Sequence, residues 1–484
     1  MSVTEAMNLS TFGHLINGVP ESANGSLYAL IDPTTGIEYA RAAIGSADDV
    51  GRACRSSEKA FRTWRRSTPA LRQELLLALA DALESNAKFF VDVECRSTGK
   101  PLAQVRSDEI PQCIDFLRYF AGIARSLPGA AAMEYAEGAT SYIRREPIGV
   151  IGAITPWNYP LMMAIWKIAP ALATGNTIIL KPAEDTPETA VMLGVLAAQI
   201  YPPGVLNVVC GDRDTGAALV AHPAPRMIAL TGSTRAGVAV AKSASEDMKL
   251  LHLELGGKAP AVVFDDADLD EAAAGIAAGA FYNSGQDCTA ATRVLVAASV
   301  AEEFTAKLTA VTAEIQLGGQ GSGDDRLGPL VSSAHCERVA AMVDRRSADT
   351  VLHIGGGKPA GPGSFYLPTI ISGVKQDDEL VQEEVFGPVV TVQSFETESE
   401  AIELANGTKY ALASSVWTSD HGTAMRMTAE LDFGCVWVGT HGTLTAEMPH
   451  GGFAGSGYGK DLSEFALAEY TRVKHVMHVT KARS

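Results

Sequence analysis

The fold is decided by residues 150–210, which read VIGAITPWNYPLMMAIWKIAPALATGNTIILKPAEDTPETAVMLGVLAAQIYPPGVLNVVC. Short apolar runs alternate, there and further on, with longer segments in which apolar residues recur every three or four positions. Such alternation predicts parallel βαβ units, and runs without polar residues predict strands covered on both faces of a sheet. We therefore expect a doubly wound α/β sheet with strands at VIGAI (150–154), NTIIL (176–180), LNVVC (206–210), MIAL (227–230) and LLHLEL (250–255).

The chain on either side of this region contains further units. Residues 71–94 have the periodicity of a helix, and a second α/β series begins near Gly256 with a helix at 268–281. The stretch 126–142 fits neither series, and the residues TRVKHVMHV at 471–479 predict an edge strand. We expect these last two pieces to pair with each other and to extend across a subunit interface.

Composition narrows the class of protein. The chain has 484 residues, 46% of them hydrophobic and 20% charged, which is ordinary globular composition for more than one domain. The net charge of −17 argues against nucleic-acid binding, because a phosphate backbone would be repelled. Seven cysteines without a CxxC pair do not predict a disulfide scaffold.

No targeting or membrane segment is expected. The N-terminus lacks a basic start followed by an apolar run, so no signal peptide is predicted. The longest apolar stretch, 160–173, is too short for a membrane span and contains Lys167. These observations predict a cytoplasmic protein with reduced thiols.

Three side chains are candidates for chemistry, and each has an ordinary alternative. Cys288 in NSGQDCTAATR has small neighbours that leave room for a carbonyl group, although most free cysteines are simply buried. Glu254 ends an apolar strand and could act as a general base, or it could point to solvent. Asn158, between a strand and a helix, could donate its amide to an oxyanion or cap the helix.

Two segments are typical of nucleotide binding. Lys181 and Glu184 follow a strand in IILKPAED, and residues at the carboxyl end of a parallel strand commonly face a nucleotide. The segment TGSTRAG has glycines at 232 and 237, which is not the G-x-G-x-x-G fingerprint. Its backbone amides can still meet a phosphate at the start of a helix.

The motifs PWNYP, KPAE, LTGST, ELGGK, GQDC and EEVFGP occur in this order, and from about Asn17 onward the chain resembles the aldehyde dehydrogenase superfamily. The resemblance implies Cys288 as nucleophile, Glu254 as general base and Asn158 as oxyanion donor. It also implies a homo-oligomer, dimer or tetramer, with three structural parts. These are an NAD-binding domain at 1–122 and 143–255, a catalytic α/β domain at 256–455, and a β-hairpin oligomerisation element at 123–142 and 456–484.

The implied cofactor is NAD, with NADP as the alternative. Glu184 favours NAD, because its carboxylate should bond a ribose 2′-hydroxyl and repel a 2′-phosphate. Glu254 favours hydrolysis of a thioester over transfer to coenzyme A, since relatives that acylate coenzyme A often lack this acid. The resemblance places the following residues at the dinucleotide: Thr155, Pro156, Trp157, Lys181, Glu184, Gly211, Gly232, Ser233, Leu255, Glu384 and Phe386.

Some stretches, such as SDEIPQCIDFLRYFAG and AEMPHGGFAGSGYGKD, resemble bacterial 4-aminobutyraldehyde dehydrogenases and, more loosely, betaine aldehyde dehydrogenases. Asp108 aligns with an acid that faces the substrate amine in such relatives; the alternative is a solvated helix face shared with Glu109. Met162 and Trp166 are expected in the aldehyde tunnel.

Two details qualify this assignment. Met163 lies on the same predicted helix as Met162 and Trp166, where relatives line the aldehyde tunnel. At least one of the three is expected in the core, because these positions cannot all share one narrow helix face. Asp461, in GYGKD, stands where many relatives have a glutamate, and in some relatives this glutamate is linked to proton relay. That role is therefore not carried over to Asp461.

Several alternatives compete with this interpretation. A semialdehyde dehydrogenase would need basic residues at the channel mouth, and an apolar tunnel could equally serve aromatic or fatty aldehydes. A non-catalytic protein could keep the fold, but it would most simply have lost Cys288, Glu254 or Asn158. A cysteine hydrolase would need a Cys–His pair, and no histidine lies near Cys288 in the sequence. No metal site is predicted, because no His/Cys cluster has ligand spacing.

Overall fold

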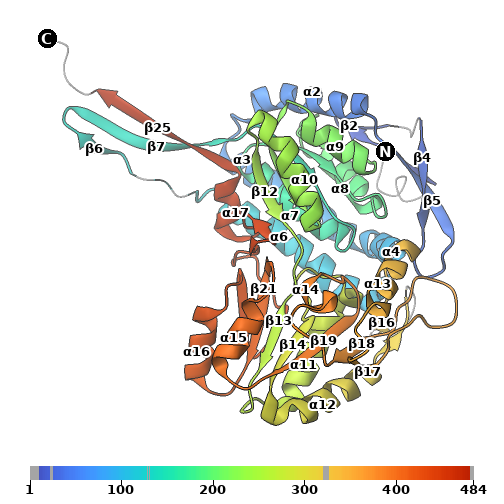
Figure 1. Cartoon of the computed structure of the whole chain (residues 1–484). Helices are drawn as coiled ribbons and strands as arrows, with labels where there is room; N and C mark the ends of the chain where they lie inside the picture. Colours follow the sequence, from blue (N-terminus) through green and yellow to red (C-terminus); the bar gives the residue numbers. More distant parts are fainter. Residues whose placement is uncertain (1–9, 22–24, 128, 130, 320–325, 480–484) are drawn as a thin grey trace.

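The computed structural model describes residues 10–21, 25–127, 129, 131–319 and 326–479. Two large sheets lie in separate halves of the molecule, and a long hairpin projects from the body (Figure 1). The first nine residues, on which part of the signal-peptide prediction rested, lie outside the described range, as do Pro128, Ala130 and the last five residues of the predicted hairpin segments.

The first half contains an eight-stranded sheet with a parallel centre. Its order is β24-β12-β11-β8-β9-β10-β2-β3, and the five strands from β12 to β10 pair in parallel, while the edge pairs are antiparallel. The strands are β2 (Leu15–Ile16), β3 (Val19–Pro20), β8 (Val150–Ile154), β9 (Thr177–Lys181), β10 (Leu206–Val208), β11 (Pro225–Thr231), β12 (Leu250–Glu254) and β24 (Gly457–Tyr458).

Helices cover both faces of this sheet, as the sequence predicted. One group contains α2, α9 and α10, and the other contains α7 and α8; the helices of each group contact one another and the strands. The reversal of direction after β10 puts the two groups on opposite faces, because parallel crossovers are right-handed. Their bounds are α2 (Ala47–Trp64), α7 (Pro160–Ala173), α8 (Glu188–Ala198), α9 (Arg213–Ala221) and α10 (Thr234–Ala244).

The second half contains a seven-stranded sheet in the order β17-β18-β19-β14-β13-β21-β22, parallel except for the edge pair β17–β18. Its strands are β13 (Pro260–Val263), β14 (Arg293–Ala297), β17 (Val351–Ile354), β18 (Thr369–Ser372), β19 (Val389–Phe395), β21 (Ala413–Trp417) and β22 (Cys435–Val438). Its helices are α11 (Leu269–Phe281), α12 (Ala301–Ala313), α13 (Ser333–Asp344), α14 (Glu379–Gln382), α15 (Glu398–Asn406) and α16 (His421–Glu430).

The projecting hairpin joins two distant segments of the chain. Strand β7 (Ala139–Pro147) pairs antiparallel with β25 (Thr471–Val479) over nine residues and with β6 (Met133–Ala136) on its other edge. Helix α17 (Ser463–Glu469) leads into β25. The predicted pairing of the segment around 126–142 with the C-terminal strand is therefore confirmed.

The helices before the first sheet differ in one respect from the sequence prediction. The helical pattern at 71–94 is divided between two helices at Asn86, whose side chain bonds back to the carbonyl of Ala82. Asparagine competes for local backbone groups in this way and therefore favours helix ends. The helices here are α3 (Pro69–Ser85), α4 (Ala87–Thr98), α5 (Leu102–Gln104) and α6 (Ile110–Ile123), with a π-helical turn (Val105–Glu109) between the last two.

Short strands complete the fold. They are β1 (Thr11–Phe12), β4 (Leu27–Ile31), β5 (Glu38–Ala43), β15 (Gln316–Leu317), β16 (Arg326–Leu327), β20 (Tyr410–Ala411) and β23 (Phe453–Ala454). The largest apolar core lies around α7, all of whose residues are buried. Among the helices that the structure describes, none has the length and apolar character that a membrane span requires.

Candidate active site

A cavity of about 1030 Å³ lies where the carboxyl ends of β8, β11 and β12 face the second half of the molecule. Carboxyl ends of parallel strands meet at one edge of a sheet, which is where such folds bind ligands. The cavity collects most of the side chains that the sequence singled out: Asp108, Pro156, Trp157, Asn158, Met162, Trp166, Gly232, Ser233, Glu254, Leu255, Cys288, Glu384 and Phe386.

Four predicted cofactor residues do not line this cavity. Thr155 and Lys181 follow or end neighbouring strands, and the Thr155 amide donates to the carbonyl of Lys181 at 3.1 Å. The buried Lys181 ammonium lies 3.6 Å from a carboxylate oxygen of the half-exposed Glu184 side chain. Gly211 follows β10 with φ +152°, a conformation that only glycine adopts readily. All four therefore lie at the carboxyl edge of the first sheet, beside the cavity.

The loop that carries Cys288 is held in an unusual conformation. Asn283, Ser284 and Gly285 after α11 all have φ between +48° and +68°, in the left-handed region that non-glycine residues rarely occupy. Buried hydrogen bonds hold it: the Asn283 amide donates to the carbonyl of Asn158 at 2.9 Å, and the Ser284 hydroxyl to that of Gly328 at 2.7 Å. Local strain of this kind is typical of functional sites.

The backbone of this loop also presses against ELGGK. A Cβ atom on Gly257 would overlap the carbonyl oxygen of Cys288, so only glycine allows the two segments to approach this closely. The Gly257 amide donates to a carboxylate oxygen of Glu384 at 2.8 Å. The two motifs and Glu384 are thereby fixed around one point.

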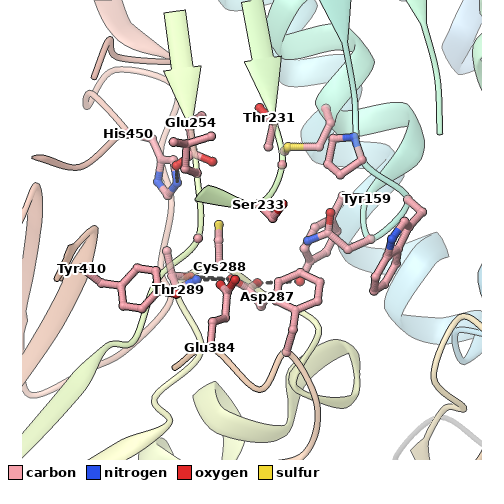
Figure 2. A pocket seen from close by; sticks show the side chains of 18 of the residues that line it. Tyr159, Thr231, Ser233, Glu254, Asp287, Cys288, Thr289, Glu384, Tyr410 and His450 are labelled. Carbon is pink, nitrogen blue, oxygen red and sulfur yellow. Dashed lines mark hydrogen bonds and ion pairs between the residues drawn. The ribbon is translucent and has the colours of Figure 1, made fainter. Parts of the chain in front are cut away.

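The Cys288 thiol is half-buried and points toward Glu254 and His450, with Asp287 and Glu384 nearby (Figure 2). Burial and the negative charges of Glu254, Asp287 and Glu384 raise its pKa well above the usual value of a thiol. Burial likewise raises the pKa of Glu384 to about 7. Arg235, Arg338 and Lys409 also line the cavity, but burial and the acids around the sulfur dominate, so the nucleophile is mainly a thiol.

Asn158 is buried and placed to act beside the thiol. Its amide Nδ2 donates to the carbonyl of Gln286 at 3.0 Å, and this carbonyl also accepts from Asn283 at 3.1 Å. An amide carries two N–H groups, so one remains for an oxygen in the cavity. This arrangement fits the oxyanion role and does not use Asn158 as a helix cap, since α7 has no side-chain cap.

Glu254 is buried and not solvent-exposed. It ends β12 and is 1% exposed, and neither carboxylate oxygen makes a hydrogen bond to any residue that the structure describes. The His450 ring lies next to it, with Nε2 3.4 Å from Oε1 of Glu254. The alternative of a strand-end glutamate in solvent is therefore wrong.

His450 lines the cavity although the sequence analysis did not single it out. No histidine is near Cys288 in the sequence, yet His450 lies beside it in space, packed against Trp166 with ring centroids 5.1 Å apart. Ligand atoms of Glu254, Cys288 and His450 all lie within 4.8 Å of one another. The three residues are far apart in the sequence, so spacing along the chain could not reveal this cluster, and the absence of a metal site stays a prediction.

A network of buried charged side chains lies next to His450, the neighbour of the general-base candidate Glu254. Asp461 forms an ion pair with Lys167 of α7 and lies 3.1 Å from Nε2 of His252, and all three are fully buried. Burial opposes the charged form of Asp461, but Lys167 and His252 hold its pKa well below the usual range. Asp461 also forms a backbone bridge with His450, which connects this network to the cavity.

The surroundings of Asp108 decide whether it lies on a solvated helix face with Glu109 or faces the cavity. Asp108 lies on the π-helical turn, lines the cavity and accepts hydrogen bonds from Tyr282 and Gln112. Its neighbour Glu109 is buried and paired with Lys100 at 2.7 Å. The two acids therefore do not form a solvated helix face.

The methionine and tryptophan side chains of α7 are both core and cavity residues. Met162, Met163 and Trp166 are 2–6% exposed, belong to the main core and all line the cavity. The expectation that at least one of them belongs to the core is confirmed, and all three line the cavity as well. The cavity wraps around the start of the helix, and so it contacts more than one narrow face.

Comparison with known proteins identifies the family. The model of the "Aldehyde dehydrogenase family" matches residues 20–476. Retinaldehyde dehydrogenase 3 of Homo sapiens is 39% identical over 463 residues, covering 94% of this chain and 90% of that protein. An aldehyde dehydrogenase of Alternaria alternata is 38% identical over 465 residues, covering 95% and 93%.

Solved structures agree. The NAD⁺ complex of an aldehyde dehydrogenase from Bacillus cereus has a TM-score of 0.96 at 35% identity, covering 99% of this chain and 98% of that one. Betaine aldehyde dehydrogenase from Staphylococcus aureus, in complex with NAD⁺, has a TM-score of 0.95 at 34% identity, covering 100% and 97%. The fold and the thiol-lined cavity thus define an aldehyde-oxidising enzyme. The chain belongs to the aldehyde dehydrogenase family.

Sequence reasoning missed several residues that the cavity brings together. Asp287, Tyr159 and Tyr282 line it beside Cys288, and His450 faces Glu254. Asp287 and Tyr159 lie inside motifs that the sequence analysis had quoted, and Tyr282 directly precedes NSGQDCTAATR, so adjacency was the available signal. His450 stands in the quoted stretch AEMPHGGFAGSGYGKD, far from Cys288 in the chain, and nothing in that stretch indicated that it meets Glu254.

Proposed function

We propose that the protein oxidises an ω-aminoaldehyde, such as 4-aminobutanal, to the corresponding amino acid with NAD as oxidant. The observation that carries the substrate assignment is a continuous acidic and aromatic wall. Asp108 accepts from the Tyr282 hydroxyl, Tyr282 stacks on Tyr159 with ring centroids 6.5 Å apart, and the Tyr159 hydroxyl donates to Asp287 at 2.6 Å. Asp287 directly precedes Cys288.

This wall suits a cation. Each carboxylate keeps lone pairs beyond the hydrogen bonds that it accepts here, and two tyrosine faces lie between the two acids. An ammonium group entering from Asp108 would find negative charge along its path, whereas a carboxylate group would be repelled. The apolar side chains of Met162 and Trp166 would contact the carbon chain.

The cations that line the cavity support the same choice over a semialdehyde. Lys409 is paired with Glu383 at 2.7 Å, and Arg338 donates to the carbonyl of Val385. Arg235 follows Ser233 at the start of α10. These cations lie beside the residues assigned to the dinucleotide, and so they do not provide an anion site for the aldehyde.

The residues at the first sheet fit a dinucleotide. Ser233 caps α10, and the first amides of that helix face the cavity, where a pyrophosphate would bind. Trp157 and Phe386 form an aromatic edge with centroids 5.3 Å apart, and Glu384 presents a carboxylate next to them. Lys181 and Glu184 extend the row toward an adenosine ribose, and Glu184 favours NAD over NADP. The relatives solved as NAD⁺ complexes support this cofactor.

The chemical steps follow from the positions of the side chains. NAD supplies a hydride acceptor when it is bound. The Cys288 thiol loses its proton to water, and its sulfur attacks the aldehyde carbon, while the carbonyl electron pair moves to the oxygen that Asn158 and the Cys288 backbone amide hold as an oxyanion. After oxidation the acyl group remains on sulfur as a thioester. Glu254 then takes a proton from water, which attacks the thioester carbon and releases the acid and the thiol.

We further propose three structural parts with the predicted bounds: an NAD-binding domain at 1–122 and 143–255, a catalytic domain at 256–455, and an oligomerisation element at 123–142 and 456–484. The hairpin supports a homo-oligomer, dimer or tetramer, because Tyr135, Val473 and Met477 are exposed on it. A cytoplasmic location stays a prediction from the N-terminal pattern and from the short length of the longest apolar stretch.

The proposal is tested by NADH formation with 4-aminobutanal and butanal. The wild type should prefer the amine, and Asp108→Asn should lose about 5- to 30-fold of that preference, since a half-buried ion contact contributes about 1–2 kcal/mol. Asp115→Asn, which removes an exposed acid of α6 outside the cavity, is the matched control. Cys288→Ala should be inactive.

Three other outcomes would each refute a different part of the proposal. Equal rates with the two aldehydes in the wild type would refute the aminoaldehyde assignment and leave the thioester chemistry. Equal losses in Asp108→Asn and Asp115→Asn would refute the specific role of Asp108. Absence of NADH with every aldehyde would refute the enzymatic proposal.

A further inference from the structure

Three side chains with metal-binding atoms converge at the end of β12. One ligand atom each of Glu254, Cys288 and His450 lies within 4.8 Å of the other two. A Cys, His and carboxylate set is one that Zn²⁺ prefers. Such a group comes together from three distant parts of the chain, and neither the fold nor the proposed oxidation requires a metal there.

The potential ligands are short of partners. Neither carboxylate oxygen of Glu254 makes a hydrogen bond among the described residues, and the same holds for Nε2 of His450. Both side chains are at least 96% buried, and their only close approach to each other is 3.4 Å. Buried polar atoms without partners are costly, and a cation between them would satisfy both.

The surrounding charge favours a cation. Asp287 and Glu384 line the cavity beside Cys288, and Glu254 is itself one of the three potential ligands. These carboxylates favour a dication, and a bound metal deprotonates a thiol that ligates it. Lys460 is the ammonium that interacts with Glu254, but its Nζ is held by the carbonyls of Gly451 and Gly452.

We propose that Glu254, Cys288 and His450 bind Zn²⁺ and that the ion holds the enzyme in a reversible inactive state. Bonds of about 2.0–2.3 Å in a tetrahedron separate the ligand atoms by about 3.3–3.8 Å, so the observed cluster needs movements of only about 1 Å. Rotation of the half-buried Cys288 side chain supplies them. The fourth position opens to the cavity, where water can complete the coordination.

The physical consequence is mutual exclusion between zinc and aldehyde. Sulfur that ligates zinc cannot attack a carbonyl carbon, and a Glu254 carboxylate on the metal cannot take a proton from water. Removal of zinc by a chelator restores both groups, because no covalent bond other than coordination is formed. Zinc should therefore act as an inhibitor that a chelator reverses.

The binding test uses chelator-treated protein without NAD or aldehyde, with Zn²⁺ titrated against a chromogenic chelator. We expect one tight site per chain in the wild type. His450→Phe keeps a ring against Trp166 but removes the ligand nitrogen, and it should weaken the tight site by on the order of 100-fold. Cys435→Ser, which changes a half-buried thiol outside the cavity, is the matched control and should bind zinc as the wild type does.

A second readout identifies the ligands directly. Co²⁺ in place of zinc should give a thiolate-to-metal absorption band in the wild type and Cys435→Ser, and this band should be absent in Cys288→Ser. Zinc binding that is equally tight in wild type, His450→Phe and Glu254→Gln would overturn the proposal, as would the absence of stoichiometric binding to the wild type.

The zinc-binding results are independent of the proposed function, whereas the inhibitory role of zinc rests on it. Active enzyme without a zinc site would refute the zinc inference and leave aldehyde oxidation intact. A zinc site in a protein that oxidises no aldehyde would support the metal site but refute the function and, with it, the inhibitory role. Inhibition by zinc that persists in His450→Phe at unchanged concentration would show binding elsewhere and also overturn the inference.

Discussion

Replacement of Asn158 by alanine should distinguish its structural role from its proposed catalytic role. One N–H of its amide donates to the carbonyl of Gln286, which supports the strained loop before Cys288. The second N–H is the candidate oxyanion donor. Alanine removes both hydrogen bonds but leaves the backbone that carries the loop.

The magnitudes of the two losses differ. The Gln286 carbonyl keeps the hydrogen bond from Asn283 at 3.1 Å, so the free energy of unfolding should fall by only about 1 kcal/mol. Loss of one oxyanion donor raises a barrier by about 2.7–4 kcal/mol, which is a 100- to 1000-fold lower rate. Catalysis should therefore suffer much more than stability.

Single-turnover NADH formation and denaturant unfolding together measure the two effects. Asn158→Ala should form NADH at least about 100 times more slowly with a nearly unchanged unfolding midpoint. A rate within about threefold of the wild type would refute the oxyanion role. An unfolding free energy lowered by more than about 3 kcal/mol would show instead that Asn158 is mainly a structural support.

Three further predictions follow from the same geometry. Asp287→Asn should lower the pKa of the Cys288 thiol, because it removes one of the acids that, together with burial, raise this pKa. The pH profile of iodoacetamide alkylation should therefore shift to lower pH. An unshifted profile would contradict the electrostatic account. Gly257→Ala should lower kcat about 100-fold, because the added Cβ displaces the Cys288 carbonyl. Gly357→Ala, where a Cβ meets open space, should leave kcat unchanged. Equal kcat in the two variants would argue against the close approach of Gly257 to the Cys288 loop. Lys167→Met should cost about 3–5 kcal/mol of unfolding free energy, because the buried Asp461 loses its ammonium partner and keeps His252. Since the pKa of Asp461 is lowered in the folded state, this stabilisation should be present above about pH 4 and be lost as the pH falls further, and a loss with rising pH would refute it.

Local pattern alone was enough for the architecture. The strands from β8 to β12 and the helices between them occur where apolar periodicity placed them, because burial on two faces demands continuous apolar runs. The nucleophile loop, the general-base candidate and the oxyanion candidate were also visible, since each lies inside a short motif of the family that the chain resembles.

Tertiary structure alone decided which of these side chains meet and what surrounds them. His450 reaches Glu254, and Lys167 reaches Asp461, across hundreds of residues of chain. Asp108 faces the cavity while its neighbour Glu109 pairs with Lys100, although both are acids on one turn. The direction of a side chain and its burial depend on how sheets and helices pack, and no local periodicity encodes the partners that packing brings from elsewhere.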